Sequence, residues 1–238
     1  MDHNMLSIPQ SIRSHWEAEL TSEIQFWDAW VRTKGSRWPD DYGDRCNPEL
    51  PLQPRLAALL PSSPPVEANI LDVGAGPLTY LGKTCQGKHV TITAVDPLAD
   101  AYDIILDRYQ VQPLVRTQKL SAEDLLTGFF PDTYDLVYAR NCLDHAYDPE
   151  RAVVQMIVVV KSGRYVVLEH RPHEGENANY SGLHQWDFSV SANGDFVISS
   201  RYTTVNMTKK YEALCTITCE IVNNGGNDNW LVTRIQKR

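Results

Sequence analysis

Hydrophobic and polar positions divide the chain into three regions with different expected structures. In the first region, residues 1–65, apolar side chains recur every three to four positions over 11–32, which predicts an amphipathic helix. The pattern then predicts a loop over 35–54 and a short helix over 56–60 that ends before Pro61. The region is therefore expected to be helical and separate from the rest of the chain.

The middle region, residues 66–170, alternates short apolar runs with connections long enough to hold helices. This alternation predicts βαβ units and a parallel sheet. The Val-rich run at 149–160 has weak helix propensity, but Asp148 is a good N-cap, Pro149 suits the first helical position, and residues 161–163 supply a stop. The expected strands are 69–73, 90–95, 114–120, 134–138 and 164–168, with helices over 98–109 and 149–160.

The last region, residues 171–238, is rich in expected strands. Alternating positions over 188–200 surround Asn-Gly at 193–194, a strong hairpin signal. Two further strands, 215–222 and 230–235, are joined by a short segment of Asn, Gly and Asp, so we expect them to pair antiparallel.

Composition narrows the class of protein. The chain has 238 residues, 42% of them hydrophobic, and a net charge of -8, which suits a globular α/β protein and argues against loose binding of nucleic acid. Its longest apolar run is far shorter than the roughly 20 residues that a membrane span needs. The N-terminus lacks the pattern of a secretion signal, and the five cysteines form no Cys-x-x-Cys pair. We therefore expect a cytoplasmic protein with reduced thiols.

The sharpest chemical signal lies where the first strand of the middle region ends. Gly74 and Gly76 follow the strand, where bare backbone can approach a ligand closely, and we expect a helix to start after them. Asp96 stands twenty residues after Gly76, at the end of the next strand. A carboxylate there can accept hydrogen bonds from the hydroxyls of a ribose, so the pattern predicts a nucleoside-binding site.

Two kinds of nucleoside cofactor fit such a site. A nicotinamide or flavin dinucleotide needs a third glycine to hold its pyrophosphate, and that position is Thr79. Asp72, two residues before Gly74, can meet an ammonium group, which S-adenosylmethionine (SAM) carries and a pyrophosphate does not. A dinucleotide-dependent oxidoreductase is therefore the disfavoured alternative.

These residues resemble the motifs of class I SAM-dependent methyltransferases over most of 66–170. Residues 72–78 are similar to the family's first motif, with Leu78 where a third glycine often stands. Asp96 resembles its ribose-binding acid. Further partial matches come in the family's order: 121–124 after the third strand, 130–138 along the fourth, Arg140-Asn-Cys-Leu-Asp-His145 with Asp148-Pro149, and 161–163 after the next helix.

The resemblance implies an α/β fold with a Rossmann-like seven-stranded sheet of order 3-2-1-4-5-7-6, its last strand antiparallel. The hairpin expected near the C-terminus agrees with that ending. Residues 1–65 would form a helical lid, and 66–238 the SAM-binding domain, with a β-rich insert at 171–210 on the substrate side. The implied ligands are SAM and its product S-adenosylhomocysteine (SAH). The implied cofactor-binding residues are Asp72, Gly74, Ala75, Gly76, Asp96, Pro97, Ala122, Glu123, Asn141 and Cys142.

Methyl transfer from SAM depends mainly on aligning the nucleophile of the acceptor and on excluding water, so a general base is optional. His170 and His184 are the candidate bases, because they flank the insert, whereas His145 in its Leu-Asp-His pattern is interpreted as structural. Glu169-His170 with His173-Glu174 offers ligand types for a metal, but Pro172 interrupts them, and no metal is assigned. The candidate substrate-binding residues are Trp30, Trp38, Tyr42, Arg45, Gln185 and Trp186, which could stack on a flat acceptor or hydrogen-bond to it.

The sequence thus predicts an enzyme that transfers a methyl group from SAM to a nitrogen or oxygen of a small metabolite, partly aromatic or heterocyclic. Expected partners are small molecules, with neither nucleic acid nor membrane. The alternative from another class is a SAM-binding regulatory or partner subunit that no longer transfers methyl groups, since so few side chains are needed for the chemistry.

Overall fold

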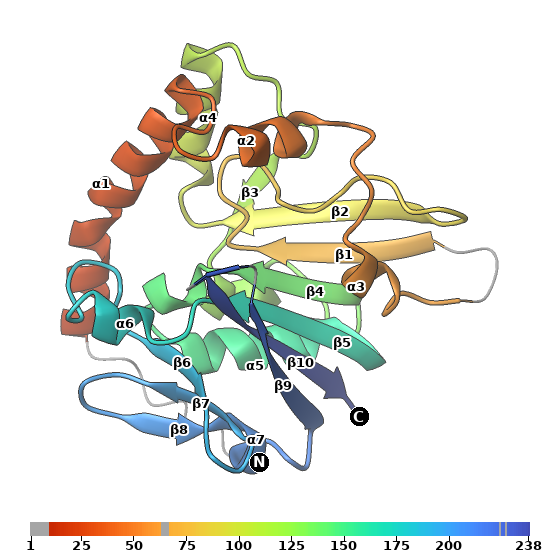
Figure 1. The fold of residues 1–238 in the computed structure, drawn as a ribbon, viewed down its shortest axis with the longest axis vertical. Coiled ribbons are helices and arrows are strands. Elements are labelled where there is room, and N and C mark those ends of the chain that lie inside the picture. The colour runs from red at the N-terminus through yellow and green to blue at the C-terminus, as the bar shows by residue number, and fades with distance from the viewer. Residues whose placement is uncertain (1–9, 63–66, 224, 227) are drawn as a thin grey trace.

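A seven-stranded sheet forms the centre of the protein, seen in a computed structural model that describes residues 10–62, 67–223, 225–226 and 228–238 (Figure 1). Its strands run in the order β3-β2-β1-β4-β5-β10-β9, with β10 antiparallel to both of its neighbours and the other neighbouring pairs parallel. This is the strand order that the sequence resemblance implied. The strands are β1 (Glu67–Val73), β2 (His89–Asp96), β3 (Thr117–Lys119), β4 (Tyr134–Arg140), β5 (Val160–His170), β9 (Cys215–Asn223) and β10 (Asn229–Lys237).

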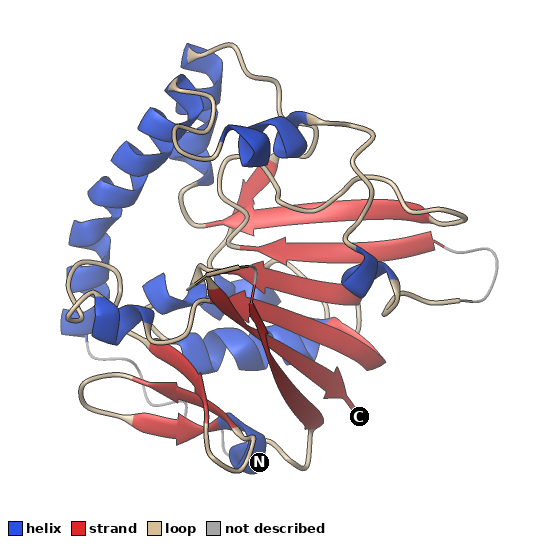
Figure 2. Ribbon diagram, viewed as in Figure 1, coloured by secondary structure: helices blue, strands red, loops and turns tan. Residues whose placement is uncertain are grey.

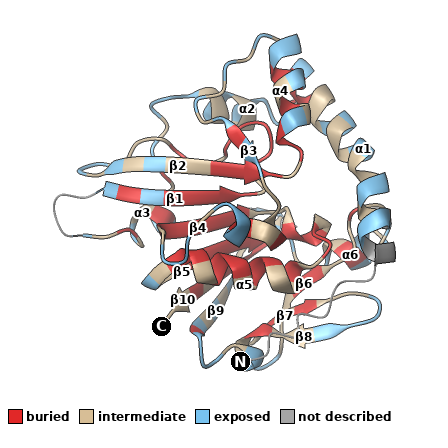
Figure 3. Ribbon diagram, turned by 180° about the vertical axis from the view of Figure 1, so that it is seen from behind, coloured by how far each residue is buried: buried red, intermediate tan, exposed pale blue. Residues whose placement is uncertain are grey.

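One face of the sheet is covered by α5 (Pro149–Val159) and the 3-10 helix η1 (Ala122–Thr127), which pack together. The predicted N-cap is confirmed, because the Asp148 side chain accepts a hydrogen bond from the backbone N–H of Arg151 at 3.0 Å. Most of α5 is buried, as Figure 3 shows from behind. The predicted helix over 149–160 is confirmed and ends at Val159. The chain passes directly into β5, so residues 161–163 lie within that strand and do not form a separate stop.

The connection from β1 to β2 contains no helix, contrary to the sequence-based prediction of a helix after Gly76. Residues 74–88 form an irregular loop that hydrogen-bonds to residues 50–52 of the N-terminal region, for example from the Leu52 N–H to the Thr84 carbonyl at 2.7 Å. Gly82 lies so close to Pro51 that an added Cβ would sit 2.1 Å from the Pro51 carbonyl oxygen. The N-terminal segment therefore covers this face of the sheet in place of the crossover helix.

That covering segment includes α3 (Pro54–Ala57), where the sequence predicted a short helix slightly later. Leu52, Leu56 and Leu60 pack against β-strand residues such as Leu136 and Tyr138 in one buried cluster. Burial of these leucines stabilises the contact by about 1.5–3 kcal/mol each, which explains how the sheet keeps an apolar cover without the usual helix.

The long helix α1 (Gln10–Arg32) agrees with the predicted amphipathic segment and packs against α4 (Ala99–Arg108) (Figure 2). Between α1 and α3 the structure forms α2 (Pro39–Cys46), where the sequence predicted only a loop. Pro39 starts α2, acidic residues fill its first turn, and Arg45 pairs with Asp41 at 3.0 Å one turn apart, all of which favour a helix.

The chain between β5 and β9 forms a small separate sheet. It contains α6 (Glu174–Asn177), β6 (Asp187–Val190), β7 (Phe196–Ser199), β8 (Thr204–Asn206) and α7 (Met207–Lys210). The predicted hairpin is confirmed, since β6 and β7 pair antiparallel around residues 191–195. Phe188 and Phe196 pack into the main core, which anchors the small sheet beside β5 and α5. None of the described helices is long and apolar enough to cross a lipid bilayer.

Candidate functional site

A cavity of about 670 Å³ lies where β1, β2 and β4 end, beneath α1. Its size is within the range typical of small-molecule sites. Residues from the predicted cofactor site line it together with aromatic residues from the N-terminal segment. The lining includes Glu23, Trp27, Trp30, Trp38, Arg45, Asp72, Gly74, Ala75, Tyr80, Asp96, Pro97, Tyr102, Ala122, Glu123, Arg140, Asn141, Cys142, His145, Arg171, Glu174, His184 and Trp230.

The glycine bend after β1 is confirmed as bare, close-packed backbone. Both glycines have positive φ values, +68° at Gly74 and +65° at Gly76. A Cβ at Gly74 would lie 2.5 Å from the Cys142 Sγ, and one at Gly76 would lie 2.9 Å from the Trp27 ring. Gly74 lines the cavity, whereas Trp27 covers Gly76, so the structure does not place Gly76 against the ligand space as predicted.

Asp96 is buried at the end of β2 and fixes the bend. Its carboxylate accepts hydrogen bonds from the N–H groups of Gly76 at 3.2 Å and Leu98 at 2.9 Å. Burial raises the pKa of Asp96 to about 6, against the opposing effect of these two backbone hydrogen bonds. The Tyr102 side chain also hydrogen-bonds to this carboxylate, so of its roughly four acceptor positions about one remains for a hydroxyl donor. Pro97 and Tyr102 line the cavity beside it.

Asp72 lies near the end of β1, just before the bend, and is also buried. It accepts a hydrogen bond from the Thr79 hydroxyl at 2.5 Å, which gives a use to the residue that breaks the dinucleotide fingerprint. Burial raises the pKa of Asp72 to about 6. Two buried acids thus face one cavity. Because burial removes water from each carboxylate, a hydrogen-bond donor or a cation on a ligand would stabilise its charged form.

The remaining predicted cofactor residues meet at the ends of β3 and β4. Ala122 and Glu123 open η1, and Glu123 Oε1 accepts hydrogen bonds from the N–H groups of Tyr147 at 2.9 Å and Asp148 at 3.2 Å. Burial raises the pKa of Glu123 to about 7. Asn141 and Cys142 come after β4 and line the cavity as well. With Ala75, this brings together every predicted cofactor residue except Gly76.

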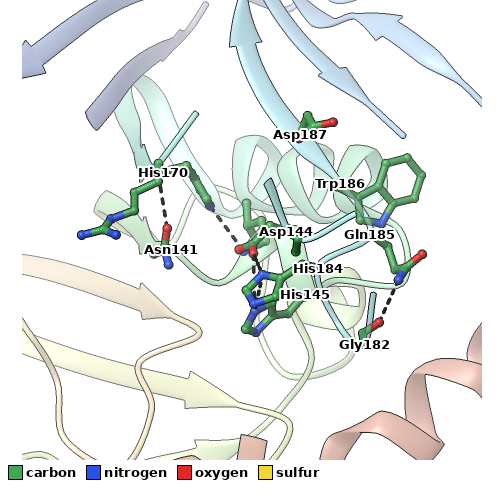
Figure 4. A network of polar contacts seen from close by, with 12 residues as sticks. Asn141, Asp144, His145, His170, Gly182, His184, Gln185, Trp186 and Asp187 are labelled. Carbon is green, nitrogen blue, oxygen red and sulfur yellow. Dashed lines mark hydrogen bonds and ion pairs between the residues drawn. The ribbon is translucent and has the colours of Figure 1, made fainter. Parts of the chain in front are cut away.

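Asp144, His145 and His184 form a polar cluster (Figure 4), and both histidines line the cavity. Asp144 Oδ2 lies 2.7 Å from His184 Nδ1 and 3.4 Å from His145 Nε2. Burial opposes ionisation of Asp144, but His145 and His184 outweigh it and hold its pKa below the usual value. The hydrogen bond from the His184 ring to the Asp144 carboxylate in turn raises the pKa of His184. Hydrogen bonds within this cluster therefore explain why these three side chains lie so close together.

His170, the other candidate base, lies in the core outside the cavity lining. Its ring stacks on Phe188 with centroids 4.2 Å apart, and its Nε2 accepts a hydrogen bond from the Leu143 N–H at 3.3 Å. Burial lowers the pKa of His170 to about 4. Because the His170 ring does not reach the cavity, it cannot take a proton from a bound methyl acceptor. The prediction that His170 is a base is therefore wrong, and the residue belongs to the core.

Half of the predicted substrate-binding residues also lie elsewhere. The Gln185 amide donates to the carbonyl oxygens of Tyr180 and Gly182, both at 2.8 Å, and the Trp186 ring N–H donates to Ala146 O (Figure 4). Tyr42 packs behind Trp30, with ring centroids 5.1 Å apart. These three residues are not part of the cavity lining, whereas Trp30, Trp38 and Arg45 line the cavity.

The metal-ligand alternative at 169–174 is not supported by the geometry. Glu169 binds the Arg55 guanidinium through two hydrogen bonds of 2.6 Å, His170 lies in the core, and His173 is exposed. Among the residues that the structure describes, ligand atoms converge at Asp144, His145 and His184 instead, within 4.8 Å of one another.

Several cavity residues were missed by sequence reasoning. Tyr80 comes from the irregular loop, Trp230 from β10 and Glu23 from α1, so only folding brings them together. Arg140 could have been predicted as a site residue from the sequence. It is the last residue of an expected strand, and the residues that follow it were already assigned to the site.

Comparisons with known proteins point to one family. A family model described as a methyltransferase domain matches residues 48–207, which is more than half of the chain. No match is found among curated proteins. A SAM-dependent methyltransferase from Thermotoga maritima, a possible histamine N-methyltransferase, is similar over 89% of this chain and 99% of its own, with a TM-score of 0.50 and 16% identity.

Two more solved structures show the same likeness. The CurJ carbon methyltransferase is similar over 74% of this chain and 50% of its own, with a TM-score of 0.50 and 14% identity. A SAM-dependent methyltransferase from Methanosarcina mazei is similar over 79% of this chain and 99% of its own, with a TM-score of 0.45 and 15% identity. Such identities concern the fold alone. With the family match over residues 48–207 and the strand order of the sheet, the chain belongs to the class I SAM-dependent methyltransferases.

Proposed function

We propose that this protein catalyses methyl transfer from SAM to a nitrogen or oxygen of a small, partly aromatic or heterocyclic metabolite. The observation that carries the proposal is one cavity that joins the predicted cofactor residues to an aromatic wall and to His184, which pairs with the buried Asp144. When bound, SAM supplies a methyl group on a sulfonium, which is already activated for displacement. The protein then has to align the acceptor and exclude water.

The donor and acceptor groups at one end of the cavity fit SAM. We assign Asp96 to the ribose hydroxyls and Asp72 to the ammonium group, since both are buried acids that face the same space. Ala122 and Glu123 would border the adenine. Gly74 has no side chain to cover the backbone, which allows the amino-acid end of SAM to approach it closely.

Residues 1–65 are proposed to act as a lid, although the boundary with the domain at 66–238 falls within 63–66, outside the described residues. In support, the Trp16 ring N–H donates to the His145 carbonyl at 2.7 Å, which ties α1 to the loop after β4. Trp30 and Trp38 offer flat faces to an acceptor. Arg45 donates to the Leu78 carbonyl at 2.8 Å, which favours a role in attaching α2 to the glycine loop.

His184 is the proposed general base. Its Nδ1 is held by Asp144, so the lone pair of Nε2 is left to accept a proton from the acceptor. Because Asp144 raises the pKa of His184, the unprotonated base accumulates as the pH rises through a midpoint above 6.5. Methyl transfer is expected to rise over the same pH range.

This assignment predicts that Asp144→Asn lowers the pKa of His184. The substitution removes the hydrogen bond to an anion, while burial, which opposes the charged imidazolium, stays. The His184 ring proton signals followed by NMR from pH 5 to 9 should show the lower midpoint. Asp132→Asn, at an exposed site beside Lys237, is the matched control and should leave His184 unchanged. An unchanged midpoint in Asp144→Asn would contradict the pairing.

The function itself is tested by SAH calorimetry and by turnover with a panel of small aromatic amines and phenols. We expect binding of SAH with micromolar-scale affinity, and SAH formation from SAM with at least one acceptor. His184→Ala should keep SAH affinity and lower turnover by about 100-fold or more. Absence of heat with both SAM and SAH would rule the proposal out. Equal loss of SAH affinity in His184→Ala and Asp96→Ala would contradict the separate roles.

A further inference from the structure

Arg140 is the last residue of β4 and lies against the cavity in a fixed orientation. Its guanidinium carbon is 3.9 Å from the centroid of the Tyr80 ring and 4.3 Å from that of Trp230. Tyr80 in turn stacks on Tyr138, with ring planes 14° apart. Aromatic faces thus hold the planar guanidinium, so little side-chain freedom is left to lose when a ligand binds.

Among the described residues, the hydrogen-bond donors of Arg140 have no acceptor. Its Nε is buried without a hydrogen-bond partner, and the structure gives its guanidinium no hydrogen bond to any other described residue. The nearest carboxylate oxygen, Glu169 Oε2, is 3.8 Å from Nε, too far for a hydrogen bond. A buried donor without a partner is costly, which is unusual unless a ligand supplies the acceptor.

The charge of Arg140 is also incompletely balanced. Glu169 already receives two hydrogen bonds from Arg55 at 2.6 Å and one from the Tyr138 hydroxyl at 3.0 Å. One carboxylate therefore serves two guanidinium groups, and a positive charge is left over at the cavity wall.

The other two arginines of the cavity wall are different. Arg171 pairs with Asp228 at 3.0 Å, and Arg45 pairs with Asp41 at 3.0 Å. Both therefore have a carboxylate at hydrogen-bonding distance within the described structure. Arg140 stands apart as the arginine that is oriented, partly buried and without such a partner.

We propose that Arg140 binds a carboxylate inside the cavity, an inference that rests on the proposed methyltransferase function. A planar guanidinium offers parallel N–H donors that match the two oxygens of a carboxylate. This group could come from the methionine end of SAM or from the methyl acceptor. In both cases Tyr80 and Trp230 fix the plane in which the carboxylate is held.

The first arm of the test compares two cofactor fragments by calorimetry. SAH carries the amino-acid carboxylate, whereas 5′-methylthioadenosine has the same nucleoside without it. If the cofactor supplies the carboxylate, Arg140→Gln weakens SAH binding by about 10- to 100-fold and leaves 5′-methylthioadenosine unchanged. Arg234→Gln removes the same charge from an arginine that pairs with Glu220 at 3.0 Å and does not line the cavity, so it is the control and should leave SAH binding unchanged.

The second arm asks whether the acceptor supplies the carboxylate. Here SAH affinity is unchanged in Arg140→Gln, and the SAH-loaded wild type binds benzoate more tightly than neutral benzamide. Arg140→Gln should abolish that preference, and Arg234→Gln should keep it. If Arg140→Gln does not fold, Arg140→Lys replaces it, since it keeps the charge and loses the paired donors, and an intermediate weakening is expected.

The inference is overturned if the substitution at Arg140 changes neither SAH affinity nor the benzoate preference while the wild type binds SAH. If the wild type binds neither SAH nor 5′-methylthioadenosine, the proposed function itself fails. The two failures are therefore distinguishable in the same set of titrations.

Discussion

Asp96→Ala is expected to weaken SAH binding by about 100-fold. The carboxylate faces the cavity and holds the bend through the Gly76 and Leu98 N–H groups, so its removal deletes an acceptor for the ribose and loosens the loop. Isothermal calorimetry on the wild type and the variant measures the loss directly. Asp96→Asn, which keeps one acceptor oxygen, should lose about tenfold.

Asp100→Ala supplies the control for Asp96. Asp100 lies four residues further along, on the exposed side of α4, where it pairs with Lys119 at 2.5 Å. Its removal changes the net charge equally and should leave SAH affinity within twofold of the wild type. Thermal melting of each variant separates a lost contact from a lost fold. A folded Asp96→Ala with wild-type affinity would remove the ribose-binding role of this residue.

Gly74→Ala is expected to destabilise the protein strongly. Alanine has a conformational cost at a φ of +68°, and its Cβ would meet the Cys142 Cβ and Sγ at 2.6 and 2.5 Å. Both groups are held by the ends of adjacent strands, so one must shift. We expect a loss of about 3–5 kcal/mol in the free energy of unfolding, measured with urea, together with weaker SAH binding.

Gly87→Ala isolates the steric part of this effect. Gly87 has a similar φ of +71°, yet a Cβ there would meet no atom within 4 Å. This variant should lose only about 1–2 kcal/mol, the conformational cost alone. Equal losses in the two variants would show that the packing of Gly74 against Cys142 contributes nothing to stability.

Much of the fold could be predicted because its signals are local. Alternating strands and helices, and the turn at 193–194, each depend on residues close together in sequence, and the hairpin and parallel strands could be inferred from them. The cofactor end of the cavity was predictable for the same reason. In a parallel sheet, residues at or just after the ends of β1, β2 and β4 meet at one edge, which brought Asp72, Asp96 and Asn141 together.

The acceptor end was harder, because its residues converge from segments far apart in sequence. His170 and His184 had equal claims in the sequence, and only packing put one on Phe188 and the other beside Asp144. The missing helix after Gly76 was unpredictable in the same way. Its absence depends on leucines at 52–60 filling the space that a helix would occupy.

Local patterns in the sequence were enough to place the strands, the bare bend after β1 and the acids that face it, since strand period and strand ends are set by neighbouring residues. The order of the strands in the sheet was implied by the family resemblance. The tertiary structure alone decided which histidine meets the cavity, what covers the loop at 74–88, and that Arg140 lies between Tyr80 and Trp230 without a hydrogen-bond partner among the described residues. The physical reason is that burial, pKa and hydrogen-bond satisfaction depend on the surroundings that distant segments create, and no local pattern encodes them.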